Sequence, residues 1–577
     1  MPRIRVLPAQ LRNKIAAGEV IERPASIVKE LIENSVDAGS TDIRVEVLRA
    51  GKGRIKVSDN GSGMEKEDAL LCLERHATSK LRDEDDLFNI TTLGFRGEAL
   101  PSIASVSRMK LITGQKGAPS GVLVEVEGGE VKETRDFPAA GTSVEIRDLF
   151  FNTPARKKFL KSDSTELFHI IDAVTREALS RWDIGFSLFT ERQETMSLGR
   201  ASGPRERILQ IFGLEFVEGL TEVTLRPQSF PQGEAGLTAF ISKADNFRNN
   251  KSYQFLFINR RPVKDQTIAH AVYAAYDGIL PQDKHPVFFL FLELDPRKVD
   301  FNVHPAKREV RFSDRQEIHR FVRGCLRDAV KKERAQDIAP FSETPQWAGK
   351  SSSPIVSFPQ GRAGGPVAGL PSGKDDPSCA GHVAEAMELR YEPSLPHLYL
   401  GDTFVAVAGT AGLTLIDHHA AHERILYENF LQGMDLDSHP LLFPRQVKLS
   451  PQEHRVVLEH KTLLSGMGME IDDFGHSTLV IRSLPAALRE ADLRGILADV
   501  AAALREGMKP FQTVREVLAA RVACHSSVRG KEILRPEEVR ELLRRLEATE
   551  HPDQCPHGRP TRIFLSLDDL KKMFKRK

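Results

Sequence analysis

Glu30 and Asn34 stand four residues apart in a run, Lys29–Gly39, that we expect to be helical. On a helix the two side chains share one face, because residues four apart are neighbours there. A carboxylate on that face can orient a water molecule. An amide oxygen one turn later can bind Mg²⁺, which prefers hard oxygen ligands together with phosphate oxygens. The pair therefore predicts the activation of water beside a metal-bound phosphate.

Asp59 ends a strand-like run, Arg54–Ser58, and is followed by a turn that contains Gly61 and Gly63. A carboxylate accepts hydrogen bonds only, so at this place it can take the exocyclic amine of adenine. The glycines let the backbone approach a nucleotide closely. Taken alone, Asp59 also fits a plain turn and Glu30 a solvated helix residue, so the prediction rests on their combination.

A later glycine-rich segment, Gly94–Leu100, can fold over the phosphates as a lid and offer backbone N–H donors. The chain contains no Walker-type G-x-x-x-x-G-K-[ST] motif. The order of these motifs resembles the ATP site of the GHKL superfamily. That superfamily includes DNA gyrase's ATPase subunit, heat-shock chaperones, sensor histidine kinases and the MutL mismatch-repair proteins.

Longer segments resemble the MutL branch of this superfamily and reach as far as residue 307. They are Ile15–Ser26, Arg75–Lys80, Gly94–Leu100, Phe150–Leu160 and Asp300–Lys307. The resemblance implies that the chain is a bacterial-type member of this family, with ATP and Mg²⁺ as its first cofactors.

The resemblance also implies a role for each matching residue. Glu30 would activate the attacking water, Asn34 would hold Mg²⁺, and Asp59 would read adenine. Lys307 would reach the γ-phosphate from a second subdomain, where a compact cation meets developing negative charge. The other nucleotide-binding residues would be Gly61, Gly63, Lys80, Gly94, Phe95, Arg96, Gly97, Glu98, Ala99, Leu100 and Thr142.

The chain of 577 residues is too long for one hydrophobic core, and its composition, 40% hydrophobic and 28% charged, is that of a globular protein. It has no apolar run of membrane-spanning length and no signal sequence. Five scattered cysteines form no disulfide framework, so we expect a cytoplasmic protein, associated with the nucleoid during repair. The net charge of +1 does not indicate nucleic-acid binding, so DNA affinity must come from local patches.

Alternating helix and strand patterns predict a multidomain α/β and α+β protein. We expect a GHKL (Bergerat-type) α/β sandwich at residues 1–215 and a second α/β transducer domain at 216–335. A Pro-, Gly- and Ser-rich flexible linker follows at 336–396. The resemblance assigns 397–577 to an α+β dimerisation and endonuclease domain, with a regulatory subdomain at about 432–512.

A second set of chemically active residues lies near the C-terminus. Asp417 is placed to begin a helix, on which His419 and Glu423 have the i, i+4 spacing of metal ligands. Cys524 and the Cys555-Pro556-His557 run add thiolate and imidazole ligands. Mixed N, O and S ligands predict Zn²⁺, or Mn²⁺ at a position richer in oxygen. The alternative for Cys524 is a buried small hydrophobe.

This region resembles the endonuclease domain of many MutL proteins, whose motif is D-Q-H-A-x-x-E-x-x-x-x-E. The chain has His418 in place of the glutamine, and it keeps Asp417, His419, Ala420, Glu423 and Glu428. Phe574 and Arg576 match the family's F-x-R ending. The resemblance implies metal-assisted phosphodiester hydrolysis, with Asp417 and Glu423 as catalytic residues and Asp417, His419, Glu423, Cys524, Cys555 and His557 as metal ligands.

The family also carries a short docking peptide for the replication sliding clamp, of the form Gln-x-x-Leu/Ile-x-Pro. By position it would include His439, Leu442 and Pro444, with histidine in place of glutamine. A literal match, Gln446–Pro451, follows at once, and the alternative for both is a strand bounded by proline. The sequence leaves the choice between the two segments open.

Candidate DNA contacts are basic residues in two clusters, although charge runs are usually just solvated faces. They are Arg156, Lys157, Lys158 and Lys161 in one cluster and Arg260, Arg261 and Lys264 in the other. Lys264 carries more weight because the family resemblance implies a DNA-contacting basic residue at that point. Arg559 is a further candidate for contact with the DNA backbone.

These observations predict an ATP-gated homodimer that surrounds DNA and nicks the discontinuous strand at a mismatch. Its partners would be DNA, the mismatch-recognition protein MutS and the sliding clamp. The alternative is a matchmaker without nuclease activity, whose C-terminal metal is structural. A topoisomerase subunit is disfavoured because a linker follows the second domain. A sensor kinase is disfavoured because too few residues precede Glu30 to hold its dimerisation helices.

Overall fold

The computed structural model describes most of the chain between residues 21 and 573. The residues outside the description are 1–20, 81–91, 95–96, 119, 192, 231–232, 244–245, 281–283, 302–309, 338–396, 401–402, 410, 433–437, 486–487, 489–490, 507–515, 517–518, 521, 524–534, 557 and 574–577. The predicted linker and the family's F-x-R ending therefore lie almost wholly outside the described residues. In the part that is described, no helix is long and apolar enough to cross a membrane.

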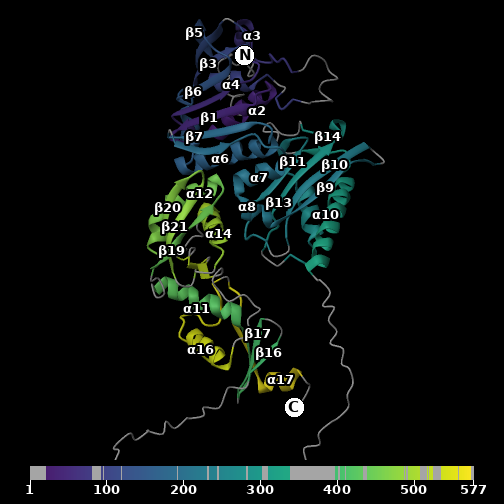
Figure 1. The fold of residues 1–577 in the computed structure, drawn as a ribbon, viewed down its shortest axis with the longest axis vertical. Helices are drawn as coiled ribbons and strands as arrows, with labels where there is room; N and C mark the ends of the chain where they lie inside the picture. The colour runs from purple at the N-terminus through teal and green to yellow at the C-terminus, as the bar shows by residue number, and fades with distance from the viewer. Residues whose placement is uncertain are drawn as a thin grey trace, which may run out of the picture.

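An eight-stranded mixed sheet forms the first domain, in the order β5-β4-β3-β6-β2-β1-β7-β8 (Figure 1). The strands are β1 (Asp42–Leu48), β2 (Arg54–Asp59), β3 (Arg108–Gly114), β4 (Gly121–Glu127), β5 (Glu130–Phe137), β6 (Gly141–Arg147), β7 (Gly185–Thr190) and β8 (Gln193–Leu198). The helices are α2 (Pro24–Asp37), α3 (Lys66–Leu71), α4 (Ala99–Ser105), α5 (Pro154–Phe159) and α6 (Asp163–Ser180).

Helix α2 is positioned by one apolar stripe. Pro24 occupies the first turn, where its missing N–H costs nothing. Ile27, Val28 and Leu31 are buried against the sheet and α6. Burial of this stripe leaves Glu30 and Asn34, which are only partly buried, on the other side of the helix.

A five-stranded sheet forms the second domain, in the order β12-β11-β13-β10-β9. Its strands are β9 (Leu220–Phe230), β10 (Gly233–Ser242), β11 (Gln254–Ile258), β12 (Arg261–Val263) and β13 (Phe288–Leu294). Helices α7 (Pro204–Phe212) and α8 (Leu214–Glu218) precede it, and α9 (Gln266–Ala275) and the charged α10 (Arg315–Asp337) pack together beside it.

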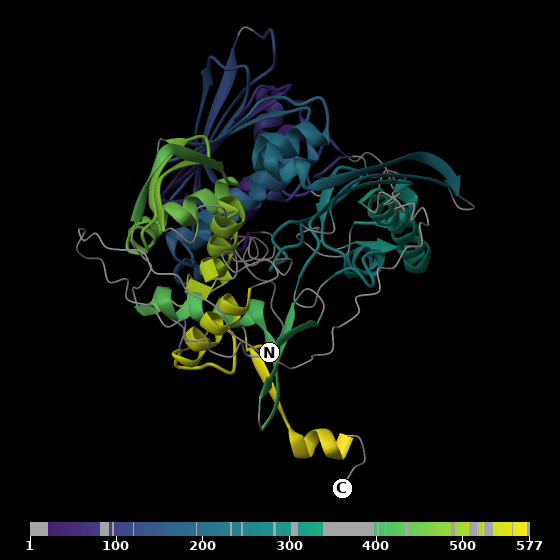
Figure 2. The same cartoon turned by 60° about the horizontal axis from the view of Figure 1, so that its bottom comes forward.

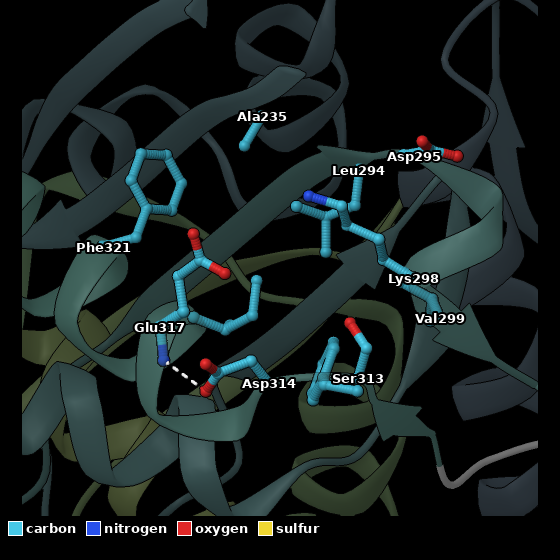
Figure 3. A pocket seen from close by; sticks show the side chains of 11 residues that line it. Ala235, Leu294, Asp295, Lys298, Val299, Ser313, Asp314, Glu317 and Phe321 are labelled. Carbon is cyan, nitrogen blue, oxygen red and sulfur yellow. Dashed lines mark hydrogen bonds between the residues drawn. The ribbon is translucent and has the colours of Figure 1, made fainter. Parts of the chain in front are cut away.

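A two-stranded ladder holds both ends of the segment 302–309, which carries Lys307 and lies outside the described residues. In this ladder β14 (Val299–Asp300) pairs with β15 (Arg311–Phe312). A small pocket beside the ladder is lined by second-domain residues, among them Leu294, Lys298 and Phe321 (Figure 3). The structure thus fixes where the Lys307 segment leaves and rejoins the second domain.

The C-terminal region contains two further sheets. A four-stranded sheet has the order β16-β17-β18-β22, and a three-stranded sheet has the order β19-β21-β20. The strands are β16 (His397–Leu400), β17 (Phe404–Gly409), β18 (Gly412–Asp417), β19 (Ser438–Lys448), β20 (Glu470–Gly475), β21 (Thr478–Pro485) and β22 (Arg562–Ser566). The helices are α11 (His418–Gln432), α12 (Pro451–Glu459), α13 (Lys461–Ser465), α14 (Leu493–Glu506), α16 (Pro536–Glu547) and α17 (Leu567–Met573).

The unit built around the three-stranded sheet contacts the first two domains. Helix α12 packs against α6, and Figure 1 shows α14 close to α8. Arg494 of α14 is buried and donates a hydrogen bond to the Phe212 carbonyl at 3.2 Å, while Asp499 accepts one from Asn249. The four-stranded sheet and α17 lie at the opposite end of this region in both views (Figure 2). The two halves of the chain are therefore in contact as well as joined by the linker.

Candidate functional site

Helix α2 carries the predicted base beside a buried lysine. The Lys29 ammonium lies 3.7 Å from a Glu30 carboxylate oxygen and 3.0 Å from one of Glu33. Burial lowers the pKa of Lys29, but attraction to Glu33 and Glu30 outweighs it, so the pKa is raised overall. Lys29 is therefore a charged residue that forms ion pairs with both carboxylates.

Glu177 of α6 adds a third carboxyl to this group. It is almost fully buried, and burial together with the nearby charge of Glu33 raises its pKa to about 8. Below that pH the side chain is protonated. We call Lys29, Glu33 and Glu177 the Lys29 cluster; it forms a buried ionisable layer next to Glu30 that the motif spacing alone does not reveal.

The amide of Asn34 is connected to the start of the predicted lid through Lys80 and Asp37. Lys80 donates to the Asn34 side-chain oxygen at 3.0 Å and pairs with Asp37 at 2.6 Å. The same Asp37 carboxylate accepts the backbone N–H groups of Leu93 and Gly94, at 2.9 and 3.0 Å. Asp37 therefore joins the predicted metal-binding helix to both the Lys80 segment and the start of the lid.

Two glycines of the predicted lid approach other groups closely, and the position of the second, Gly97, requires glycine. A Cβ on Gly94 would lie 3.0 Å from the Lys80 ammonium and 3.5 Å from the Asn34 amide oxygen. Gly97 adopts a φ of +62°, and a Cβ there would overlap the Ala77 carbonyl. Its own carbonyl accepts the His76 N–H at 3.2 Å. Glu98 and Leu100 continue into α4, whereas Phe95 and Arg96 lie outside the described residues.

Asp59 sits at the end of β2, where the sequence predicts an adenine-reading carboxylate. One oxygen accepts the Ser35 hydroxyl at 2.8 Å and the other accepts the Gly61 N–H at 2.8 Å. Burial raises the pKa of Asp59, and these hydrogen bonds oppose the shift. Thr142 pairs with Asp59 across the β2–β6 ladder, which places both predicted residues together. A Cβ on Gly63 would overlap a neighbouring carbonyl, so this turn requires glycine.

Neighbouring arginines of the second domain have different environments. Arg260 is partly exposed, stacks on Trp182 at 4.6 Å and pairs with Asp183 at 3.3 Å. Arg261 is only 6% exposed and donates to the Thr92 carbonyl just before the lid. The sequence-based grouping of Arg261 with DNA contacts is therefore wrong, because its guanidinium faces the interior between the first two domains.

The predicted C-terminal ligands begin at the junction of β18 and α11. The Asp417 carboxylate accepts the Ala420 N–H at 2.9 Å and so caps α11, as the sequence predicts. His419 lies 3.3 Å from Glu423 on the same helix. The i, i+4 spacing thus brings two of the predicted ligands into contact.

The same helix holds the segment that carries Cys555. Arg424 donates to the Gln554 carbonyl at 2.5 Å, and Glu428 accepts the N–H groups of Glu550 and His551 at 2.6 and 3.2 Å. Cys555 is buried, at 1% exposure. Cys524 and His557 lie outside the described residues. Among the residues that are described, no group of three or more His, Cys, Asp or Glu side chains is arranged to hold a metal ion.

Three family models match successive parts of the chain. Residues 22–145 match the histidine kinase-, DNA gyrase B- and HSP90-like ATPase. Residues 208–331 match the C-terminal domain of DNA mismatch repair protein, and 398–534 match the MutL C-terminal dimerisation domain. The fold and the nucleotide site therefore define a GHKL-type ATPase that also carries a dimerisation domain.

Full-length relatives identify the family. The chain is 40% identical to the DNA mismatch repair protein MutL of Thermodesulfovibrio yellowstonii and 38% identical to that of Geotalea daltonii, over 100% of each chain. A solved structure, the Aquifex aeolicus MutL ATPase domain complexed with ADP, is 31% identical, covering 48% of this chain and 94% of that one with a TM-score of 0.35. The chain belongs to the MutL family of DNA mismatch repair proteins, and the predicted fold class is confirmed.

Proposed function

We propose that this chain is an ATP-gated homodimeric clamp that couples mismatch recognition to strand removal and nicks DNA at a C-terminal metal site. The observation that carries the gating is that Lys80, which donates to Asn34, and the Gly94 N–H, at the start of the predicted lid, share the Asp37 carboxylate. A ligand that displaces Lys80 from Asn34 therefore removes one partner of the residue that holds the start of the lid. Nucleotide binding and lid position are coupled by this arrangement.

Hydrolysis in this site follows from the same residues. Asn34 would hold Mg²⁺, which would supply positive charge at the phosphates, and Asp59 takes the adenine amine. Glu30 accepts a proton from the water that attacks the γ-phosphorus, and ADP leaves with the electrons of the broken P–O bond. Lys29 supports this role because its ammonium lies 3.7 Å from a Glu30 carboxylate oxygen and orients it. Lys307 supplies a cation to the γ-phosphate from the second domain.

The predicted DNA contacts lie on surfaces that a duplex can reach. Lys157 and Lys158 are exposed on α5, beside the half-buried Arg156, and Lys264 is exposed after β12. Basic side chains of this kind contact phosphates without reading sequence. They support a DNA affinity that is largely independent of sequence and falls with salt.

The C-terminal residues fit a metal in part. Asp417 ends β18 and caps α11, His419 and Glu423 lie on α11, and Cys555 belongs to the segment tied to that helix. These residues, with Cys524 and His557, would hold the ion. A bound Zn²⁺ or Mn²⁺ would polarise a DNA phosphate and lower the pKa of a coordinated water. The alternative function is a matchmaker without nuclease activity, in which the same ligands hold a structural metal.

The two candidate clamp-binding segments differ sharply in exposure. Leu442 and Phe443 are 87% and 80% exposed, where β19 leaves its ladder with β21 between Pro440 and Arg445. In the literal match, Val447 and Leu449 are buried in the core beneath the three-stranded sheet. A docking peptide must present its apolar side chains to a partner. We therefore assign the sliding-clamp contact to the segment with His439, Leu442 and Pro444.

Replacing Leu442 and Phe443 together by alanine should weaken binding of the full-length chain to a purified sliding clamp by about tenfold or more, because exposed apolar anchors carry most of such binding energies. Gln446→Ala is the matched control, since its side chain is exposed in the rejected segment. Surface plasmon resonance measures both. A loss of affinity in Gln446→Ala and none in the double variant would reverse the assignment.

Association of the isolated halves tests the clamp itself. The fragment 1–335 should be monomeric without nucleotide and dimeric with a non-hydrolysable ATP analogue, whereas 395–577 should be dimeric in both conditions. Exposed Leu400, Phe404 and Phe564 on the four-stranded sheet support a permanent contact there. Light scattering of both fragments gives the masses. A C-terminal fragment that stays monomeric at micromolar concentration would contradict the model.

A further inference from the structure

Arg261 lies where the second domain contacts the segment 92–94, at the start of the predicted lid. It begins β12 in the second domain, and its guanidinium donates to the Thr92 carbonyl. The Thr92 hydroxyl donates to the Gly94 carbonyl at 2.8 Å, which carries the connection into the lid. The guanidinium also lies 4.7 Å from the ring centroid of Phe301, the last described residue before the segment that holds Lys307.

The charges around Arg261 come from the first domain. Burial lowers the pKa of Arg261, and the carboxylates of Glu33 and Asp37 on α2 oppose that shift. Glu33 belongs to the Lys29 cluster beside Glu30, and Asp37 holds Lys80 and the start of the lid. One second-domain side chain therefore interacts with both ends of the helix segment that carries Glu30 and Asn34.

The hydrogen bonds of Arg261 are incomplete. Its Nη1 is buried and has no hydrogen-bond partner among the described residues, whereas Nη2 is used by Thr92. A buried N–H without an acceptor costs about 1–3 kcal/mol. Nη1 is therefore a donor that remains available to a further acceptor at the site.

We propose that Arg261 is a positioning residue for ATP hydrolysis, which holds the segment 92–94, at the start of the predicted lid, in place against the Glu30 helix. This proposal rests on the proposed role of Glu30. Arg261 acts on the hydrolytic step and leaves nucleotide affinity to Asn34 and Asp59. A planar fork with several donors suits this place, because one nitrogen bonds the Thr92 carbonyl and the others remain for further acceptors. Lysine keeps the charge but not the fork.

The test compares Arg261→Gln and Arg261→Lys in the full-length chain. The expected kcat falls by about 10²-fold in Arg261→Gln, the scale of a misplaced catalytic group. We expect a smaller loss in Arg261→Lys, and affinity for a non-hydrolysable ATP analogue within about threefold of wild type, a difference of less than 1 kcal/mol. Phosphate release gives kcat and KM, and fluorescence titration gives the affinity.

Arg207→Gln is the matched control for loss of a buried arginine. Arg207 is fully buried, lies over Phe186 and donates to the carbonyls of Trp182 and Ile184, with no contact to the lid. Thermal melting gives a temperature at which all variants are folded, and the rates are compared at that temperature. If Arg207→Gln does not fold, the control is Arg205→Gln, on the exposed side of the same helix.

The measured rates and affinities decide the proposal. A loss of kcat in Arg261→Gln that the control lacks supports it, and so does partial rescue by lysine. An unchanged kcat, or an equal loss in the control, overturns it. A fall in nucleotide affinity large enough to explain the lost rate also overturns it. Glu30→Ala distinguishes a failure of the proposed function from a failure of this inference. Normal ATP hydrolysis by Glu30→Ala would contradict the proposed function. Slow hydrolysis by Glu30→Ala together with normal hydrolysis by Arg261→Gln would contradict only this inference.

Discussion

The Glu30→Ala chain should bind ATP with near wild-type affinity and hydrolyse it about 10²–10⁴-fold more slowly, the usual cost of removing a general base. Glu30 stands one helical turn before Asn34, and one of its carboxylate oxygens lies 3.7 Å from the Lys29 ammonium. The substitution removes the proton acceptor but leaves the residues proposed to hold Mg²⁺ and adenine. Steady-state phosphate release and nucleotide titration of the purified full-length chain measure the two effects.

Two further variants serve as controls for Glu30→Ala. Asn34→Ala should lose nucleotide binding itself, because the metal and the phosphates lose their anchor and Lys80 loses a partner. Glu194→Ala, an exposed glutamate on the edge strand β8, should behave as wild type. Turnover near wild type in Glu30→Ala, with contaminating ATPases excluded, would remove Glu30 from its proposed role.

Nicking of DNA should be abolished in Asp417→Asn, while ATP hydrolysis and dimerisation stay largely intact. Asparagine caps helices as well as aspartate does, so the hydrogen bond to the Ala420 N–H can be kept and only the charge is lost. The metal then lacks one anionic ligand. A plasmid nicking assay in Mn²⁺ measures the loss, and thermal melting shows whether the domain remains folded.

The metal itself is tested separately from the reaction. Cys555→Ser should lower the zinc content of purified protein, because a thiolate is removed from the shared centre. If wild type nicks DNA and Asp417→Asn nicks it equally well, the nuclease proposal is wrong. If neither does so under any condition, the matchmaker is the better account, and His418→Gln is the change that should restore the family motif.

Local spacing predicts the candidate residues of the first site. Glu30, Asn34 and Asp59 were recognised because each belongs to a short motif whose members are close in sequence. Ser35 and Asp37 lie inside the same run, yet their importance depends on partners at Asp59 and Leu93 that only the fold brings near. The Lys29 cluster was missed for the same reason, since Glu177 is distant in sequence.

Burial was the property that the sequence could not supply. Arg260 and Arg261 are adjacent basic residues, but the first lies in a turn at a φ of +61° and the second begins a strand whose side chain faces inward. The two candidate clamp-binding segments differ in the same way. Leu442 and Leu449 each stand two residues before a proline, but Leu442 is exposed and Leu449 is buried. A charge run or a short motif gives residue types, and packing decides which of them a partner can reach.

The most direct test of the proposed function is nicking of supercoiled circular DNA in Mn²⁺, with and without the sliding clamp, by wild type, Asp417→Asn and Glu30→Ala. The clamp model predicts that wild type converts supercoiled to open circular DNA, more so with the clamp. Asp417→Asn should not nick under either condition. Glu30→Ala should keep the metal site and still nick, but its nicking should no longer depend on ATP turnover. Equal nicking by wild type and Asp417→Asn would contradict the proposed function.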